Sequence, residues 1–231
     1  RLPAPTPAAL SLLEAARARQ EARKALRAAA VDRQAPTLAE LELVHALWVE
    51  NGAFDGGGGG GGDGGGRGAA VPVEETVTES VVLCQPQDRN VHNKIFGGYL
   101  LRQSFELAFV CAYKHAHVLP EFCALGDISF LAPVEIGSIL QLRASFEHVR
   151  PDRSAVSIRV TARVVDAERG TSKATNSFHY LFSVPPAAPR AATAFAPRTF
   201  KDAMRWIAAH RREQLAAALA TDARPRFRVS A

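Results

Sequence analysis

Residues 85–114 read QPQDRNVHNKIFGGYLLRQSFELAFVCAYK, and the rest of the chain is organised around them. The stretch consists of a polar loop, the glycine pair Gly97 and Gly98, and a helix-forming segment. Glycine lets the backbone come close to whatever occupies the loop. The segment after the pair is apolar on nearly every side, with Leu100, Leu101, Phe105, Leu107, Ala108, Phe109, Val110, Cys111 and Ala112. This pattern predicts a helix that other elements enclose, not one that lies on a surface.

The segments that follow this helix are rich in β-branched and aromatic residues. Between Ile139 and Glu147 apolar and polar residues alternate one for one, as they do in a strand with one buried face. Strands are predicted at 73–84, 123–130, 139–147, 156–163 and 174–184, with turns at 151–154 and 168–171. The predicted class is α+β, in which a long central helix is wrapped by a curled antiparallel sheet.

Five short motifs together carry a family resemblance: Gln85–Asn90, Ile95–Leu100, Phe105–Ala108, Asp127–Phe130 and Pro133–Ser138. From about residue 76 to residue 184 the chain resembles the acyl-coenzyme A thioesterases, in particular the second hot-dog domain of acyl-coenzyme A thioesterase 9. The resemblance implies a hot-dog fold and hydrolysis of fatty acyl-coenzyme A to free fatty acid and coenzyme A. It also implies a homo-oligomer or a second hot-dog domain as partner. No cofactor is expected, because coenzyme A is part of the substrate.

The helix that begins at the glycine pair offers the chemistry that thioester hydrolysis needs. Its first amide groups carry the positive end of the helix dipole and are free to donate to a thioester oxygen. In the family this is the role of the second Gly and its neighbour, and a loop Asn, here Asn90, orients the water or substrate. The candidate catalytic residues are Asn90, Gly98 and Glu106, and the candidate substrate-binding residues are Phe96, Gly97, Tyr99 and Asp127.

Two positions depart from the family pattern. Asn93 stands where a Gly is usual, which predicts a different loop geometry. Phe105 occupies the position at which many relatives carry the helix carboxylate, and Glu106 lies one residue further, about 100° around the helix. A shared site is therefore expected, in which a partner hot-dog domain supplies the base. Glu106 is then either catalytic or structural, and Asp127 either contacts substrate or caps a turn.

Two other functions remain open from the sequence. Hot-dog dehydratases use a His with an acidic residue from the partner helix as acid and base, so His92 and Glu106 also suit an enoyl or 3-hydroxyacyl thioester hydratase-dehydratase. The departures at Asn93 and Phe105 also fit a non-catalytic hot-dog half that completes a partner's site.

The chain divides into five parts. Residues 1–54 form a helical connector, with one helix near 8–30 and a second that starts at the capping box Thr37–Glu40. In the resemblance these helices join two hot-dog halves, and a packed N-terminal appendage is the alternative. A Gly-rich insertion follows at 55–72, which we expect to be flexible. The hot-dog domain spans 73–184, a linker 185–199, and a C-terminal helix and tail 200–231.

Composition narrows the class of protein. The chain has 231 residues and a formal net charge of +5, but its basic residues concentrate in the terminal segments, so a nucleic-acid surface is disfavoured. Cys84, Cys111 and Cys123 share no metal-ligand spacing and are expected to be buried, reduced thiols, hence in a reducing compartment. No membrane span is predicted. The resemblance points to a mitochondrial location, otherwise cytoplasmic, and the start at Arg1 suggests that upstream sequence is missing.

Overall fold

A computed structural model describes residues 6–50, 71–126, 128–150, 152, 154–185 and 197–222. It contains a single sheet of six strands, all paired antiparallel, with the order β1-β4-β5-β6-β2 and with β3 also paired to β6. The strands are β1 (Thr78–Leu83), β2 (Glu121–Leu125), β3 (Ser129–Phe130), β4 (Ile139–Val149), β5 (Ala155–Asp166) and β6 (Thr171–Ser183). The helices are α1 (Pro7–Ala28), α2 (Leu38–Glu50), α3 (Gly97–Ala116) and α4 (Phe200–Asp222).

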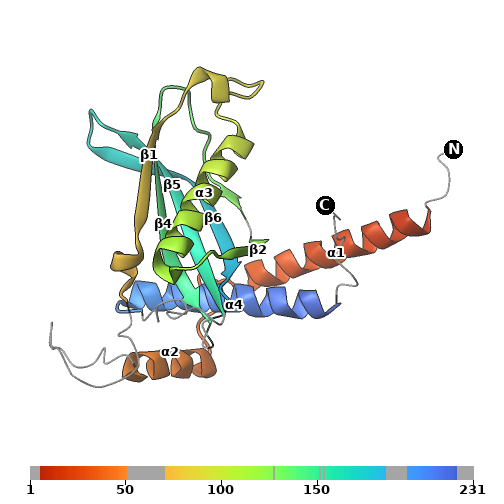
Figure 1. The fold of residues 1–231 in the computed structure, drawn as a ribbon. Coiled ribbons are helices and arrows are strands. Elements are labelled where there is room, and N and C mark those ends of the chain that lie inside the picture. Colours follow the sequence, from red (N-terminus) through yellow and green to blue (C-terminus); the bar gives the residue numbers. More distant parts are fainter. Residues whose placement is uncertain are drawn as a thin grey trace.

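Figure 1 shows α3 lying along one face of the curled sheet, which we call the inner face. Its core comes from the alternation that the sequence shows: every second residue of the long strands is fully buried there, for example Leu140, Leu142, Ile158, Val160, Phe178 and Phe182. Successive strand residues point to opposite faces of the sheet, so the alternation of apolar and polar residues determines which side chains lie on the inner face. The predicted α+β class and the helix-on-sheet arrangement are confirmed.

The helix α3 is not enclosed on every side, which corrects the prediction from its composition. Leu107, Ala108 and Cys111 are buried against the sheet, whereas Val110 and Tyr113 are about half exposed. Within the described residues, the sheet covers only one side of the helix.

The first predicted strand begins later than expected. Residues Val73–Thr76 form a short 3-10 helix, and β1 starts at Thr78. The Thr76 hydroxyl donates to the Val73 carbonyl at 2.7 Å and accepts from the Phe146 amide at 3.1 Å. The buried Thr76 therefore ties this turn to β4, and a strand through residue 76 would lose both hydrogen bonds.

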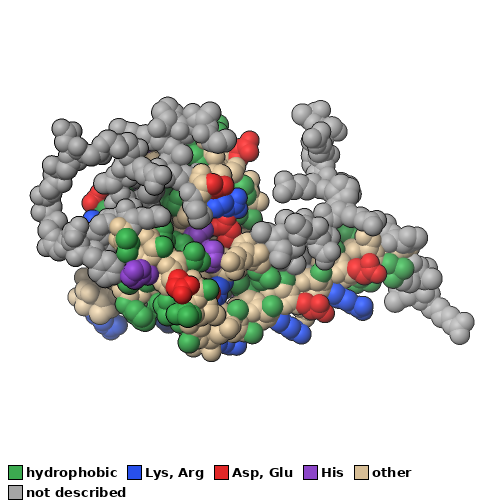
Figure 2. Space-filling model, turned by 90° about the horizontal axis from the view of Figure 1, so that it is seen from below, with side chains coloured by type: hydrophobic (Ala, Val, Ile, Leu, Met, Phe, Trp, Pro, Cys, Tyr) green, Lys and Arg blue, Asp and Glu red, His purple; other side chains and the backbone are tan. Residues whose placement is uncertain are grey.

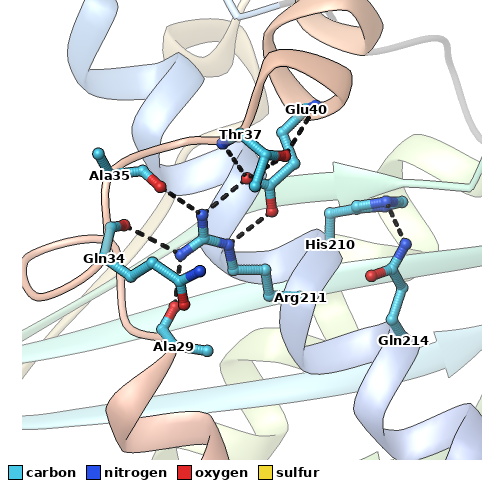
Figure 3. A network of polar contacts seen from close by, with 8 residues as sticks. All are labelled: Ala29, Gln34, Ala35, Thr37, Glu40, His210, Arg211 and Gln214. Carbon is cyan, nitrogen blue, oxygen red and sulfur yellow. Dashed lines mark hydrogen bonds and ion pairs between the residues drawn. The ribbon is translucent and has the colours of Figure 1, made fainter.

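The helices α1, α2 and α4 lie beside the lower end of the sheet (Figure 1). The expected capping box is present at the start of α2, where the Thr37 amide donates to the Glu40 carboxylate at 2.8 Å and the Glu40 amide donates to the Thr37 hydroxyl at 3.3 Å. Arg211 of α4 then binds the same carboxylate at 2.6 and 2.7 Å and donates to the carbonyls of Ala29, Gln34 and Ala35 (Figure 3). One arginine thus joins α4 to α2 and to the turn that follows α1.

The expectation that the three cysteines are buried is confirmed for two of them. Cys84 and Cys111 are buried, but Cys123, on the edge strand β2, is exposed. Burial raises the pKa of Cys111 to about 11, so that thiol stays protonated.

The predicted flexible insertion lies almost wholly outside the described residues. In the part of the chain that the structure describes, no helix is both long enough and apolar enough to cross a bilayer.

Candidate active site

The polar loop before α3 is closed by its own hydrogen bonds. Arg89 and Ile95 form an antiparallel bridge, and the Asn90 amide donates to the Lys94 carbonyl at 2.7 Å. The side-chain oxygen of Asn90 accepts from the backbone amides of His92 and Lys94, at 2.8 and 3.1 Å. Because both partners are donors, the orientation of the Asn90 amide group is determined, and its nitrogen contacts no acceptor among the described residues.

Asn93 keeps the loop geometry that glycine would allow. Its φ is +55°, in the left-handed region, and its amide donates to the Asn90 carbonyl at 3.1 Å. Asparagine tolerates this conformation better than most residues do, because its short polar side chain has little steric conflict there. The substitution at Asn93 therefore does not require the different loop geometry expected from the sequence.

The start of α3 presents unpaired donors. Phe96 is the N-cap residue; its amide donates to the Asp88 carbonyl at 2.8 Å, and its carbonyl accepts from Tyr99 and Leu100 at 3.0 and 3.2 Å. The amides of Gly97 and Gly98 donate to none of the described residues, as first-turn amides do when no side chain caps them. They lie at the positive end of a 20-residue helix. This end of the helix can therefore accept an anion or a polarised carbonyl.

Aromatic rings lie beside both glycines. A Cβ on Gly98 would come within 2.4 Å of the Phe96 ring, whereas a Cβ on Gly97 would lie 3.6 Å from the Phe130 ring, an ordinary contact. The Phe96 and Phe130 side chains are 57% and 60% exposed, so each ring has solvent on one side. Gly98 is thus the position where a side chain must displace its neighbour, and Gly97 is the position where it need not.

Of the two acidic candidates, Glu106 and Asp127, the structure describes only Glu106. Glu106 lies on the exposed side of α3, where Arg102 donates to it at 2.8 Å. Asp127 lies outside the described residues.

The candidate substrate-binding residue Tyr99 is half-buried. Burial, followed by the charge of the Asp88 carboxylate, raises the pKa of its hydroxyl. At neutral pH Tyr99 is therefore a hydroxyl that can donate.

Phe105 occupies an aromatic cluster, not a polar site. Its ring lies 5.4 Å from Phe122 of β2, 5.9 Å from Tyr180 and 6.1 Å from Phe182, measured between ring centroids. A carboxylate at residue 105 would be surrounded by these rings. Within this chain, the usual family position for the acid is therefore part of the packing between α3, β2 and β6.

The comparisons with known proteins agree with this architecture. No protein-family model matches the chain. It is 33% identical over 173 residues to acyl-coenzyme A thioesterase 10, mitochondrial, of Mus musculus, across 75% of this chain and 38% of the relative. It is 37% identical over 122 residues to acyl-coenzyme A thioesterase 2, chloroplastic, of Humulus lupulus, across 52% of this chain and 28% of the relative.

Solved structures show the same fold. An acyl-CoA hydrolase from Staphylococcus aureus, in complex with butyryl coenzyme A and coenzyme A, superposes with a TM-score of 0.60 at 22% identity, over 66% of this chain and 93% of that one. An apo-hexameric acyl-CoA thioesterase superposes with a TM-score of 0.59 at 23% identity, over 65% and 97%. The matched part of the chain is homologous to these acyl-coenzyme A thioesterases and has the hot-dog fold. It spans less than half the length of the plant and mouse thioesterases that it matches.

The structure brings together the Asn90 loop and the start of α3, both of which were predicted from the sequence. It does not bring Glu106 to them: Glu106 lies two helical turns further along α3 and pairs with Arg102. His92 is exposed, and its backbone amide supports the Asn90 side chain. Among the described residues, His92 and Glu106 therefore do not form the acid–base pair that a hydratase would use within one chain.

The prediction from sequence missed a second polar cluster, on the face of the sheet away from α3. It is centred on Glu147, whose carboxylate binds His179 at 2.9 Å and also Arg212. Arg159 lies 3.9 Å away. The strand alternation placed Glu147 on this face, but nothing near it in sequence indicated that α4 would bury it.

Proposed function

We propose that this chain takes part in hydrolysis of acyl-coenzyme A to a free acid and coenzyme A. The observation that carries the proposal is the pair of unpaired amides, Gly97 and Gly98, at the start of α3 in a chain homologous to acyl-coenzyme A thioesterases. They stand beside the loop that Asn90 closes. Family names of the plant and mouse relatives support the activity, and they do not favour a hydratase.

In the proposed reaction, water attacks the thioester carbonyl carbon and the carbonyl oxygen becomes an oxyanion. The amides at the start of α3 stabilise that charge, because they are already oriented and lie at the positive end of the helix dipole. The amide nitrogen of Asn90 positions the water or the carbonyl. The C–S bond then breaks, coenzyme A leaves as the thiol after protonation, and the acid is released. We propose no cofactor for this chemistry.

We propose that the base which takes the proton from water belongs to a partner hot-dog domain. Within this chain, Phe105 fills the usual acid position with an aromatic ring, and Glu106 is bound to Arg102 in solvent. Glu106 remains the alternative, if a partner turns that exposed side of α3 into a closed site.

Exposed apolar side chains support an oligomer or a second hot-dog domain as this partner. Val110 and Tyr113 on α3 and Phe122 on β2 are 48–50% exposed. β2 is also a sheet edge, and edges and apolar faces of this kind are usually covered. We expect light scattering of the purified chain to give a mass above that of the monomer. A monomer at micromolar concentration would remove the shared site from the proposal.

For location, we propose the mitochondrion. The mouse relatives matched over 75% of this chain are named as mitochondrial. The alternative is a plastid, because the hop relative is named as chloroplastic.

The test compares substitutions at the two glycines, using release of the coenzyme A thiol from acetyl-, butyryl- and palmitoyl-coenzyme A as the readout. We expect Gly98→Val to lower the rate about 10²-fold or more, because its side chain and the displaced Phe96 ring obstruct the amide donors. Gly97→Ala is the comparison at the neighbouring amide: it keeps the donor and its Cβ makes only an ordinary contact, so it should retain most activity. Asn90→Ala should lower the rate by a similar factor of about 10².

Thermal unfolding of each variant separates this outcome from misfolding. The double variant Phe96→Ala, Gly98→Ala removes the steric conflict at the ring, so its stability should match that of the parent chain. Full activity in a folded Gly98→Val protein would contradict the proposed oxyanion site at the start of α3. If activity appears only when a second hot-dog domain is added, it supports the shared site where Gly98→Val abolishes that activity, and the non-catalytic half where Gly98→Val leaves it unchanged.

A further inference from the structure

A groove runs between α1, α4 and the outer face of the sheet, which is the face away from α3. Its volume is about 760 Å³, within the range of small-molecule sites. Figure 2 views the molecule from below, the side on which α1 and α4 lie, and shows Lys and Arg side chains interspersed with Asp and Glu along it. Six basic residues line the groove: Arg27, Arg159, Lys201, Arg205, Arg211 and Arg212.

The floor of the groove is a buried polar cluster. Glu147 is 3% exposed, and its carboxylate binds His179 at 2.9 Å and also Arg212. Burial by itself would raise the pKa of Glu147, but the charge and hydrogen bond of His179 and the charges of the two arginines hold it at about 2. Ser177 lies beside this cluster: Arg159 donates to its hydroxyl at 3.3 Å, and the hydroxyl lies 3.4 Å from His179 Nε2.

Acidic side chains compensate only part of the positive charge. Arg211 is committed to Glu40 and three carbonyls (Figure 3), and Arg205 lies 3.7 Å from Asp202. Glu147 and Asp32 are the acidic residues that line the groove itself. Against six basic groups, the described residues therefore supply four carboxylates, which leaves an excess of two positive charges before His179 is counted.

The groove also has an apolar wall. Leu131 and Phe200 are 68% and 76% exposed, and Val31 and Met204 also line the groove. Exposed leucine and phenylalanine beside a charged floor suit a ligand with one anionic end and one apolar part.

We propose that this groove binds a phosphorylated small molecule, whose phosphate contacts Arg159, Arg212 and Lys201 and whose organic part lies against Leu131 and Phe200. A phosphate dianion matches the excess of two positive charges. One guanidinium group can donate to two phosphate oxygens at once, and the Ser177 hydroxyl adds a further donor. Because α3 lies on the inner face, this site is separate from the thioester site and is an addition to the proposed function.

The order Ser177, His179, Glu147 resembles a nucleophile, base and acid, but the surroundings favour binding over catalysis. Ser177 is in the middle of β6, where it pairs with Thr161 of β5 and Ser129 of β3. Backbone amides committed to two strand ladders are not free to stabilise an oxyanion. The hydroxyl also accepts from Arg159, so it serves as part of an anion site.

The test measures binding by calorimetry on the full chain, with phenyl phosphate, inorganic phosphate and phenol as separate probes. Phenyl phosphate should bind most tightly, inorganic phosphate more weakly, and phenol not measurably. Arg159→Gln should weaken binding of phenyl phosphate about 10-fold or more, since it removes a charge-assisted contact. Arg163→Gln is the matched control: it makes the same charge change on the same strand, but outside the groove, and should leave the dissociation constant within about two-fold.

Lys201→Gln provides a second variant at an exposed position, in case loss of Arg159 disturbs the fold, and it should weaken binding several-fold. The Gly98→Val protein should bind phenyl phosphate as the parent does, whether or not the parent hydrolyses thioesters. The proposal is overturned if phenyl phosphate shows no saturable binding, if phenol binds equally well, or if inorganic phosphate matches phenyl phosphate. It is also overturned if Lys201→Gln and Arg163→Gln have the same effect, or if Gly98→Val abolishes binding.

Discussion

The inner and outer faces of the sheet bury different kinds of side chain. The inner face packs Ile158, Phe178 and other fully buried apolar residues against α3. The outer face packs against α4 with polar and charged groups between them, including Glu147 with His179 and Arg212. Apolar burial stabilises the fold directly, whereas a buried ion cluster first offsets the free energy of desolvating its charges. The difference indicates that the inner face holds the domain together and that the outer face is built to present charge.

The largest expected effect lies on the inner face. Phe178 is fully buried, and Phe178→Ala should lower the free energy of unfolding by about 3–5 kcal/mol, because it leaves a cavity that the surrounding strands cannot fill. Urea unfolding measures this change. Val81→Ala, at a 64% exposed position on β1, is the control and should change stability by less than about 0.5 kcal/mol. A small loss for Phe178→Ala would show that the inner face is not the main source of stability.

The next expected effect is a dependence of the free energy of unfolding on pH, which arises from the outer face. Because the pKa of Glu147 is about 2 in the folded chain and near 4.5 when unfolded, its stabilisation is complete above pH 4.5 and is lost as the pH falls towards 2. Glu147→Gln should therefore cost about 3 kcal/mol at neutral pH and progressively less below pH 4.5.

Denaturant unfolding of both proteins from pH 7 to pH 3 measures the difference between them. Glu40 also has a pKa of about 2, held down chiefly by its hydrogen bond with Arg211, so the parent protein loses stability from both carboxylates in this range. Glu168→Gln, in the turn before β6, is the control for an exposed carboxylate. A difference between parent and Glu147→Gln that stays constant with pH would mean that Glu147 is not ionised in the folded chain.

The smallest effect concerns the capping box of α2, whose Glu40 links that helix to α4. Thr37→Ala removes one hydroxyl that accepts from the Glu40 amide and should cost about 1 kcal/mol. Thr37→Ser keeps the hydroxyl and should restore nearly all of that stability. Thermal unfolding compares the three proteins. Equal losses for Ala and Ser would assign the effect to the threonine methyl group instead of the cap.

The sequence alone determined the elements whose signals are local. The glycine pair marks the start of α3, which begins at Gly97 in the structure, and the Thr37–Glu40 pattern marks the start of α2. The alternation along 139–147 identifies which residues of β4 face the core. The Asn90 loop and the glycine pair were also predicted to lie together, because only a few residues separate them.

Only the tertiary structure decided which surfaces are buried. The apolar composition of α3 predicted full enclosure, yet Val110 and Tyr113 are half exposed, because in the described chain the sheet covers one side of the helix. Glu147 alternates as a solvent-facing strand residue, yet it is 3% exposed, because α4, which begins at Phe200, packs over it. Spacing along a strand indicates the face on which a side chain lies. What covers that face depends on contacts between distant segments, which no local pattern records.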